Sequence, residues 1–166
     1  MERKHFIRTA GVMGLLFTAG AGMSFKRQEE EQLSKQMVQE FVGASHRDMD
    51  KVKDMLEAYP TLLNAAHDWK HGDFETGLGA ASHVGYKELA KYFLDKGAQA
   101  NIFTACLFGE LTVVKSMLEA FPQALHAKGP HGFTLLHHAE KGGEDATEVK
   151  EYLVSLGAVD KKIALY

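Results

Sequence analysis

Histidine is the residue type in this chain with the widest chemical use, and nine of the 166 residues are histidines. An imidazole binds transition metals and transfers protons near neutral pH. His67 and His71 are four residues apart, a spacing that would place both on one face of a helix as zinc ligands, with Asp68 and Asp73 nearby. Gly72 and its polar neighbours instead predict an extended loop, in which this spacing does not converge. We therefore predict no metal site and no cofactor, and keep a small metal-dependent hydrolase built on these loop histidines as an alternative.

Other catalytic constellations are missing from the sequence. Nucleophilic catalysis requires a Ser or Cys activated by a His and an orienting acid, yet the chain has no nucleophile elbow, phosphate-binding glycine loop or paired-carboxylate motif. Its single cysteine, Cys106, cannot form an internal disulfide, and we predict a small buried side chain rather than a reactive thiol. The sequence therefore predicts a protein that is not an enzyme.

Two loops combine histidine with aromatic residues. Residues 67–75 contain the only tryptophan of the chain and a phenylalanine among polar residues, and residues 129–133 repeat the combination in a shorter form. Exposed aromatic side chains are typical anchors for a protein partner. The predicted partner-binding residues are Trp69, His71, Asp73, Phe74, Glu75, His131, Phe133 and His138. The alternative is that Trp69 packs beneath its own loop and Phe74 packs on the next repeat.

These loops belong to a duplicated chain. Residues 55–60, Met-Leu-Glu-Ala-Tyr-Pro, return at 117–122 as Met-Leu-Glu-Ala-Phe-Pro, 62 positions later and identical at five of six positions. Residues 92–98 are echoed at 152–158, which indicates a unit of about 31 residues in two alternating forms. One form should end its second helix at an aromatic residue and proline, and the other at glycine.

Each unit is predicted to contain two short helices. In the second helices, apolar residues such as Leu89, Ala90 and Phe93 recur at spacings of one and four, which places them on one face that needs a neighbouring unit to cover it. The first helices are marked by small residues, for example at 43–45 and 80–82. Ser34 is the expected N-cap of the first helix.

Residues 76–86, Thr-Gly-Leu-Gly-Ala-Ala-Ser-His-Val-Gly-Tyr, followed by paired aliphatic residues and Gly97-Ala98, resemble an ankyrin repeat. Residues 134–139, Thr-Leu-Leu-His-His-Ala, form a second copy, and 105–110 and 43–48 form weaker ones. Gly77 and Leu135 replace the proline of the family pattern. The resemblance covers residues 37 to about 160.

The resemblance implies an all-α ankyrin-repeat solenoid of about four helix-turn-helix repeats, at about 37–66, 67–99, 100–130 and 131–160. Hairpin-like finger loops would connect the repeats, and the loops at 67–75 and 129–133 would be two of them. It also implies binding of a protein partner by the finger tips and the exposed side of the first helices. His137 occupies the position of the family's histidine, which implies a structural hydrogen bond. The adjacent His138 is expected to be the freer of the two.

Residues 1–21 are predicted to be a signal peptide. Arg3, Lys4 and Arg8 precede an uncharged apolar segment, and the small residues at 19–21 predict cleavage after Ala21. The basic motif resembles a twin-arginine export signal with Lys4 in place of the second arginine, and the general secretory route is the alternative. Both routes predict a periplasmic or cell-envelope protein, and a retained membrane anchor is a further alternative. Residues 22–36 are predicted to be a linker and the start of the first helix, and 161–166 a C-terminal tail.

Removal of residues 1–21 changes the formal net charge from −3 to −5. An acidic surface argues against nucleic acid and anionic lipid as partners. We therefore expect a non-catalytic protein-protein interaction module that acts outside the cytoplasm, without stable membrane insertion after cleavage. A self-associating structural or stress-protective protein is the remaining alternative.

Overall fold

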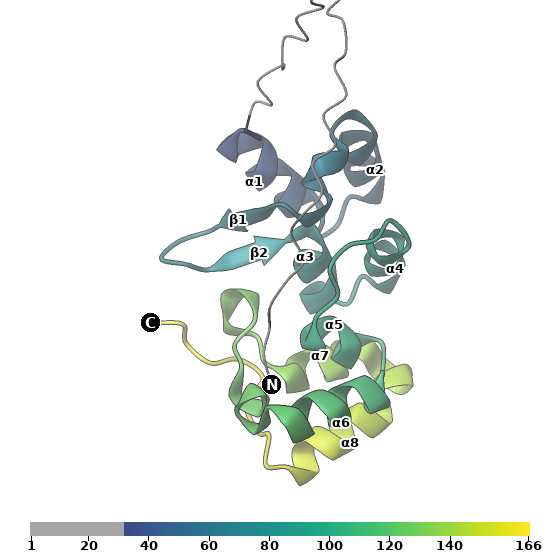
Figure 1. Cartoon of the computed structure of the whole chain (residues 1–166), viewed down its shortest axis with the longest axis vertical. Helices are drawn as coiled ribbons and strands as arrows, with labels where there is room; N and C mark the ends of the chain where they lie inside the picture. Colours follow the sequence, from purple (N-terminus) through teal and green to yellow (C-terminus); the bar gives the residue numbers. More distant parts are fainter. Residues whose placement is uncertain (1–31) are drawn as a thin grey trace, which may run out of the picture. The chain divides into compact units, whose positions relative to one another are not determined.

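The computed structural model describes residues 32–166, so the predicted signal peptide and most of the predicted linker lie outside the described residues. The described chain is mostly helical, as the sequence predicts, and includes one short β-hairpin (Figure 1). The main elements are α1 (Lys35–Ala44), α2 (Met49–Ala58), β1 (Ala66–Asp68), β2 (Phe74–Thr76), α3 (Gly77–Val84), α4 (Lys87–Asp95), α5 (Ile102–Leu107), α6 (Leu111–Ala120), α7 (Leu135–Gly142) and α8 (Thr147–Ser155). Short 3-10 helices lie at η1 (Pro60–Asn64), η2 (Pro122–His126), η3 (Pro130–Gly132) and η4 (Gly143–Ala146). Within residues 32–166 we find no helix of the length and apolarity needed to cross a membrane.

The helices end where the sequence predicts. Both α2 and α6 are followed by one aromatic residue and then a proline, and Pro60 and Pro122 begin the 3-10 helices that follow. The turns after α4 and α8 contain Gly97 and Gly157 with φ of 88° and 95°, in the left-handed region that glycine adopts without steric cost. Two further predictions are confirmed: the Ser34 side chain accepts a hydrogen bond from the first turn of α1, and Cys106 is buried.

The buried apolar residues form two clusters, which follow the duplication. One cluster is built on α1 to α4, with Phe41 and Phe93 in edge-to-face contact at its centre. The other is built on α5 to α8 and contains Val114 and Leu153. Leu107 of α5 is buried in the first cluster, so α5 contributes to both. We call residues 32–99 the first half and 100–166 the second half.

The packing of α3 departs from a straight stack of repeats. Besides α1 and α5, its neighbours in a consecutive stack of helix pairs, this helix also contacts α7. The 3-10 helix η3, which precedes α7, also contacts α3. The loop that leads into α7 is thereby brought against the hairpin that leads into α3.

The β1–β2 hairpin contains residues 67–75, which the sequence predicts to be a finger loop. The two strands pair antiparallel, with His67 opposite Glu75. Since side chains alternate between the faces of a strand, Glu75 is buried while the preceding Phe74 is 62% exposed. The hairpin therefore directs one carboxylate inward and one aromatic ring outward.

The structure corrects the expectation that His138 is the freer of two adjacent histidines. His138 lies on the buried face of α7 with no exposed surface, where its Nδ1 atom is 2.7 Å from the Thr134 carbonyl oxygen and its ring packs on Phe103. The neighbouring His137 is only partly buried, and its Nε2 atom lies 2.8 Å from the His83 carbonyl oxygen. The pKa of His138 is lowered to about 4, mainly by burial; the hydrogen bond to the Thr134 carbonyl opposes the shift, and His137 and His83 add to it.

The lowered pKa of His138 predicts a loss of stability in acid. In the unfolded chain this imidazole takes up a proton near its ordinary pKa of 6.5, whereas the folded protein resists protonation until about pH 4. The contribution of His138 to stability is therefore present above pH 6.5 and is lost as the pH falls towards 4, by about 2 kcal/mol between pH 7 and pH 5. Urea unfolding with chelator present should show this difference in the wild type and a smaller one in His138→Leu. An equal pH dependence in both proteins would contradict the assignment.

Candidate metal centre

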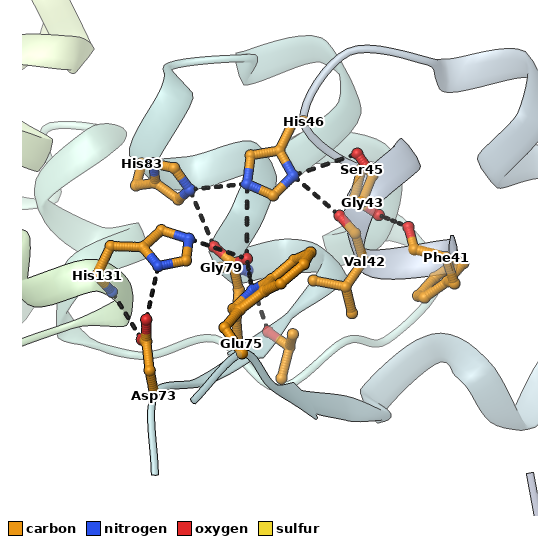
Figure 2. Close-up of polar contacts among 12 residues, drawn as sticks. Phe41, Val42, Gly43, Ser45, His46, Asp73, Glu75, Gly79, His83 and His131 are labelled. Carbon is orange, nitrogen blue, oxygen red and sulfur yellow. Dashed lines mark hydrogen bonds and ion pairs between the residues drawn. The ribbon is translucent and has the colours of Figure 1, made fainter. Parts of the chain in front are cut away.

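Four side chains converge between the hairpin, α3 and the loop before α7. They are His46, Glu75, His83 and His131, and one potential ligand atom from each lies within 4.8 Å of the others (Figure 2). We call them the His/Glu cluster. His46 follows the C-terminus of α1, Glu75 lies in β2, His83 lies in the last turn of α3 and His131 lies in η3. Three of the four residues belong to the first half and one to the second.

Glu75 is at the centre of the cluster and is 1% exposed. Its Oε2 atom accepts a hydrogen bond of 2.7 Å from the Trp69 indole Nε1. Its Oε1 atom lies 2.9 Å from His83 Nε2 without the alignment of a hydrogen bond, and no group among the described residues donates to it. Burying a carboxylate without adequate partners costs several kcal/mol. Either a proton taken up by the cluster or a bound cation would compensate this buried charge.

Three of the distances between the potential ligand atoms are close to those of a tetrahedral site. His83 Nε2 lies 3.1 Å from His46 Nε2, and Glu75 Oε2 lies 3.5 Å from the Nε2 atoms of both His46 and His131. Zinc bonds of 2.0–2.1 Å in a tetrahedron place neighbouring ligand atoms roughly 3.3–3.4 Å apart. Because all four potential ligand atoms lie within 4.8 Å of one another, shifts of the side chains would bring them around one ion of this size.

The Nε2 atom of His46 is oriented by the end of α1. The Nδ1 atom of His46 lies 3.0 Å from the Val42 carbonyl oxygen and 3.3 Å from that of Gly43. Both carbonyls lie in the last turn of α1, where helical carbonyls lack intrahelical partners. Since a carbonyl oxygen only accepts, Nδ1 of His46 carries the proton. In the neutral ring the Nε2 lone pair then points into the cluster.

His131 is oriented by the carboxylate of Asp73. Asp73 Oδ1 accepts a hydrogen bond of 2.8 Å from the His131 backbone N–H, and Oδ2 lies 2.7 Å from His131 Nδ1. These contacts hold His131 in the left-handed region, with φ 57°, a conformation that costs a side-chain-bearing residue about 1 kcal/mol. A carboxylate on the outer nitrogen of a histidine is the usual support of a metal-binding imidazole.

The ring of His83 is held by stacking, whereas the outer nitrogens of His46 and His131 are held by hydrogen bonds. Its ring stacks on Phe133, with the ring centres 5.0 Å apart and the planes 18° apart. Its backbone carbonyl accepts the hydrogen bond from His137 described above. A proton on His83 Nε2 is aligned with His46 Nε2, and it leaves Glu75 Oε1 and His131 Nε2 without a donor among the described residues. A single cation satisfies all four atoms together.

The ligand set indicates which ion fits. Three imidazoles and one carboxylate suit Zn²⁺ and the other divalent ions that bind imidazole, whereas Mg²⁺ and Ca²⁺ prefer oxygen ligands. Four protein ligands complete a tetrahedral shell, as in sites that hold an ion, whereas catalytic zinc sites keep one position open.

The structure divides the predicted site residues into two sets. Glu75 and His131 belong to the His/Glu cluster, Asp73 and Trp69 bind its members, and Phe133 stacks on His83. The remaining three lie elsewhere. The His71 ring packs against Tyr166, Phe74 is exposed, and His138 is in the apolar core. With no exposed side chain, Glu75 and His138 are not on a surface that a partner can touch.

Sequence reasoning missed His46 and His83, and it considered His67 and His71, which the cluster does not include. A signal for the missed pair is present in the sequence. Residues 43–46 are Gly-Ala-Ser-His and residues 80–83 are Ala-Ala-Ser-His, so consecutive units carry a histidine at the end of the same small-residue motif.

No family model and no curated protein matches the chain. The function proposed below therefore rests on the geometry of the cluster.

The hydrogen bonds at the outer nitrogens predict the tautomers of two rings. In chelator-treated protein at pH 8, His46 and His131 should both carry the proton on Nδ1, because a carbonyl and a carboxylate accept from that atom. Two-bond ¹H–¹⁵N NMR distinguishes the two tautomers. Asp73→Asn should release His131 from this tautomer and leave His46 unchanged. The opposite tautomer at both rings of the wild type would contradict the geometry.

Proposed function

We propose that this protein binds one divalent transition-metal ion, preferably Zn²⁺, through His46, Glu75, His83 and His131. The observation that carries the proposal is the convergence of three imidazole nitrogens on a buried carboxylate, at 2.9–3.5 Å from its oxygens. This proposal departs from the sequence-based prediction of no metal site, which considered only the loop histidines. It does not retain the hydrolase built on His67 and His71, since neither belongs to the cluster.

The role proposed for the ion is binding rather than catalysis. Four protein ligands leave no free tetrahedral position for a substrate or a reactive water. The side chains of His46 and His131 are 23% and 27% exposed, whereas those of His83 and Glu75 are 8% and 0% exposed. An ion therefore enters and leaves past His46 and His131. The scaffold that we propose is an exported, ankyrin-type helical repeat.

Zinc titration of the full chain tests the proposal directly. Trp69 is the only tryptophan and donates to Glu75, so its fluorescence should respond to an ion at the cluster. After chelator treatment, we expect saturable binding of one Zn²⁺ per chain. His83→Ala should weaken binding by more than the roughly 10–100-fold expected for the loss of an outer-shell partner. His71→Ala, which changes a histidine outside the cluster, should bind as the wild type does. Unchanged zinc affinity in His83→Ala would refute the site.

A second function, the binding of a protein partner through the finger loops, is proposed on a separate observation. Phe74 is 62% exposed on a hairpin whose neighbouring residue, Glu75, is locked in the cluster. A rigidly presented aromatic ring is typical of interaction hot spots. The face would comprise Phe74, His71 and the accessible edges of Trp69, His131 and Phe133.

Replacement of Phe74 tests this second proposal. With a partner cross-linked and recovered from the cell envelope of the source cells, Phe74→Ala should cost about 2 kcal/mol or more of binding free energy, roughly a 30-fold loss of affinity. Phe121→Ala is a matched control, because Phe121 is 65% exposed but follows α6 and lies outside the finger loops. Equal capture by the wild type and both variants would exclude this face.

A further inference from the structure

The two halves of the described chain have separate apolar cores, and several polar side-chain contacts join them. Asp73 binds His131, His137 donates to the carbonyl of His83, and Lys87 binds both Asp145 and the carbonyl of Gly142. Leu107 is the buried apolar residue that crosses from the second half into the first core. A junction of this composition gains less from apolar burial than either core does.

The His/Glu cluster lies across this junction. His46, Glu75 and His83 come from the first half, and His131 comes from the second (Figure 2). In the absence of an ion, the atoms that face one another are the Nε2 lone pairs and a carboxylate, which repel unless protons separate them. With an ion, the same four atoms are bound to one centre. The cluster atoms of the two halves therefore repel one another without the ion and are held together with it.

From this arrangement, which rests on the metal-binding function proposed above, we propose that the ion clamps the two halves together and that its loss lets them separate at the finger side. The chain is then a metal-dependent conformational switch. Its hinge is α5, which contacts α3 and α7 and contributes side chains to both cores.

Separation of the two halves would also change the width of a groove between α4 and α6. This open groove, of about 640 Å³, is lined by Lys91 and Leu94 of α4, Phe108 after α5, and Val113 and Met117 of α6. Since α4 belongs to the first half and α6 to the second, the width of the groove depends on how far the halves are apart. The separation of α4 from α6 therefore reports on the clamp.

Distances between spin labels on α4 and α6 test the inference. Glu88 and Glu119 are exposed on these helices, and Glu88→Cys with Glu119→Cys in the full chain provides the two attachment points. The native Cys106 does not compete for the label, because it is buried and burial raises its pKa to about 12. We expect a single narrow distance distribution with saturating Zn²⁺, and a broader, shifted distribution after chelation.

Variants of two proposed ligands distinguish zinc binding that joins the two halves from zinc binding that does not. His46→Ala removes a ligand from the first half and leaves Glu75, His83 and His131 to bind zinc across the junction, so zinc should still narrow the distribution. His131→Ala leaves three ligands in the first half, so zinc should still change Trp69 fluorescence while the distribution stays broad. His71→Ala serves as the control outside the cluster.

The outcomes are distinguishable. Zinc binding by the wild type without any change of distance overturns the clamp and leaves the metal site intact. The clamp is also overturned if zinc narrows the distribution of His131→Ala as fully as that of the wild type, with Trp69 fluorescence confirming occupancy in both. Failure of the wild type to bind zinc overturns the metal site and the clamp together.

Discussion

The buried carboxylate of Glu75 is the constraint around which this part of the molecule is arranged. It is fully enclosed by protein, yet receives one hydrogen bond, from Trp69. An enclosed negative charge is tolerated only where positive charge or strong donors compensate it. Three imidazole nitrogens surround it, and two of their rings have the outer nitrogen fixed by a carbonyl or by Asp73. A bound cation is the arrangement that satisfies the carboxylate and the imidazoles at once.

The cluster around this carboxylate depends on the packing of α3 against α7 and η3. The hairpin places Glu75 inward, and His131 reaches it only because the loop before α7 lies against the hairpin and α3. The C-terminal tail supports this loop: the Ile163 backbone N–H donates to the Gly132 carbonyl at 2.8 Å, and Thr134 Oγ1 donates to the Asp160 carbonyl at 2.6 Å. The predicted tail at 161–166 therefore supports the loop that contains His131, one of the proposed ligands.

The cluster lies between two halves that have separate apolar cores. Each copy encloses its own apolar core, because helices of one copy cover each other's apolar faces. The surface left between the copies is free to carry polar groups, and in this chain it carries histidines and carboxylates. The proposed metal site lies outside both cores, because none of its four residues belongs to an apolar cluster.

The sequence by itself determined the mostly helical character of the described chain, its proline and glycine helix ends, its Ser34 cap and the buried cysteine. These features depend on near neighbours in the chain, whose residue types report directly on backbone conformation and helical periodicity. The sequence also drew attention to Glu75 and His131, but as exposed partner-binding residues. Only the tertiary structure decided that Glu75 points inward and that α3 meets α7, which brings together residues 46, 75, 83 and 131. Such convergence depends on contacts between units distant in the chain, and periodicity within a unit carries no information about them.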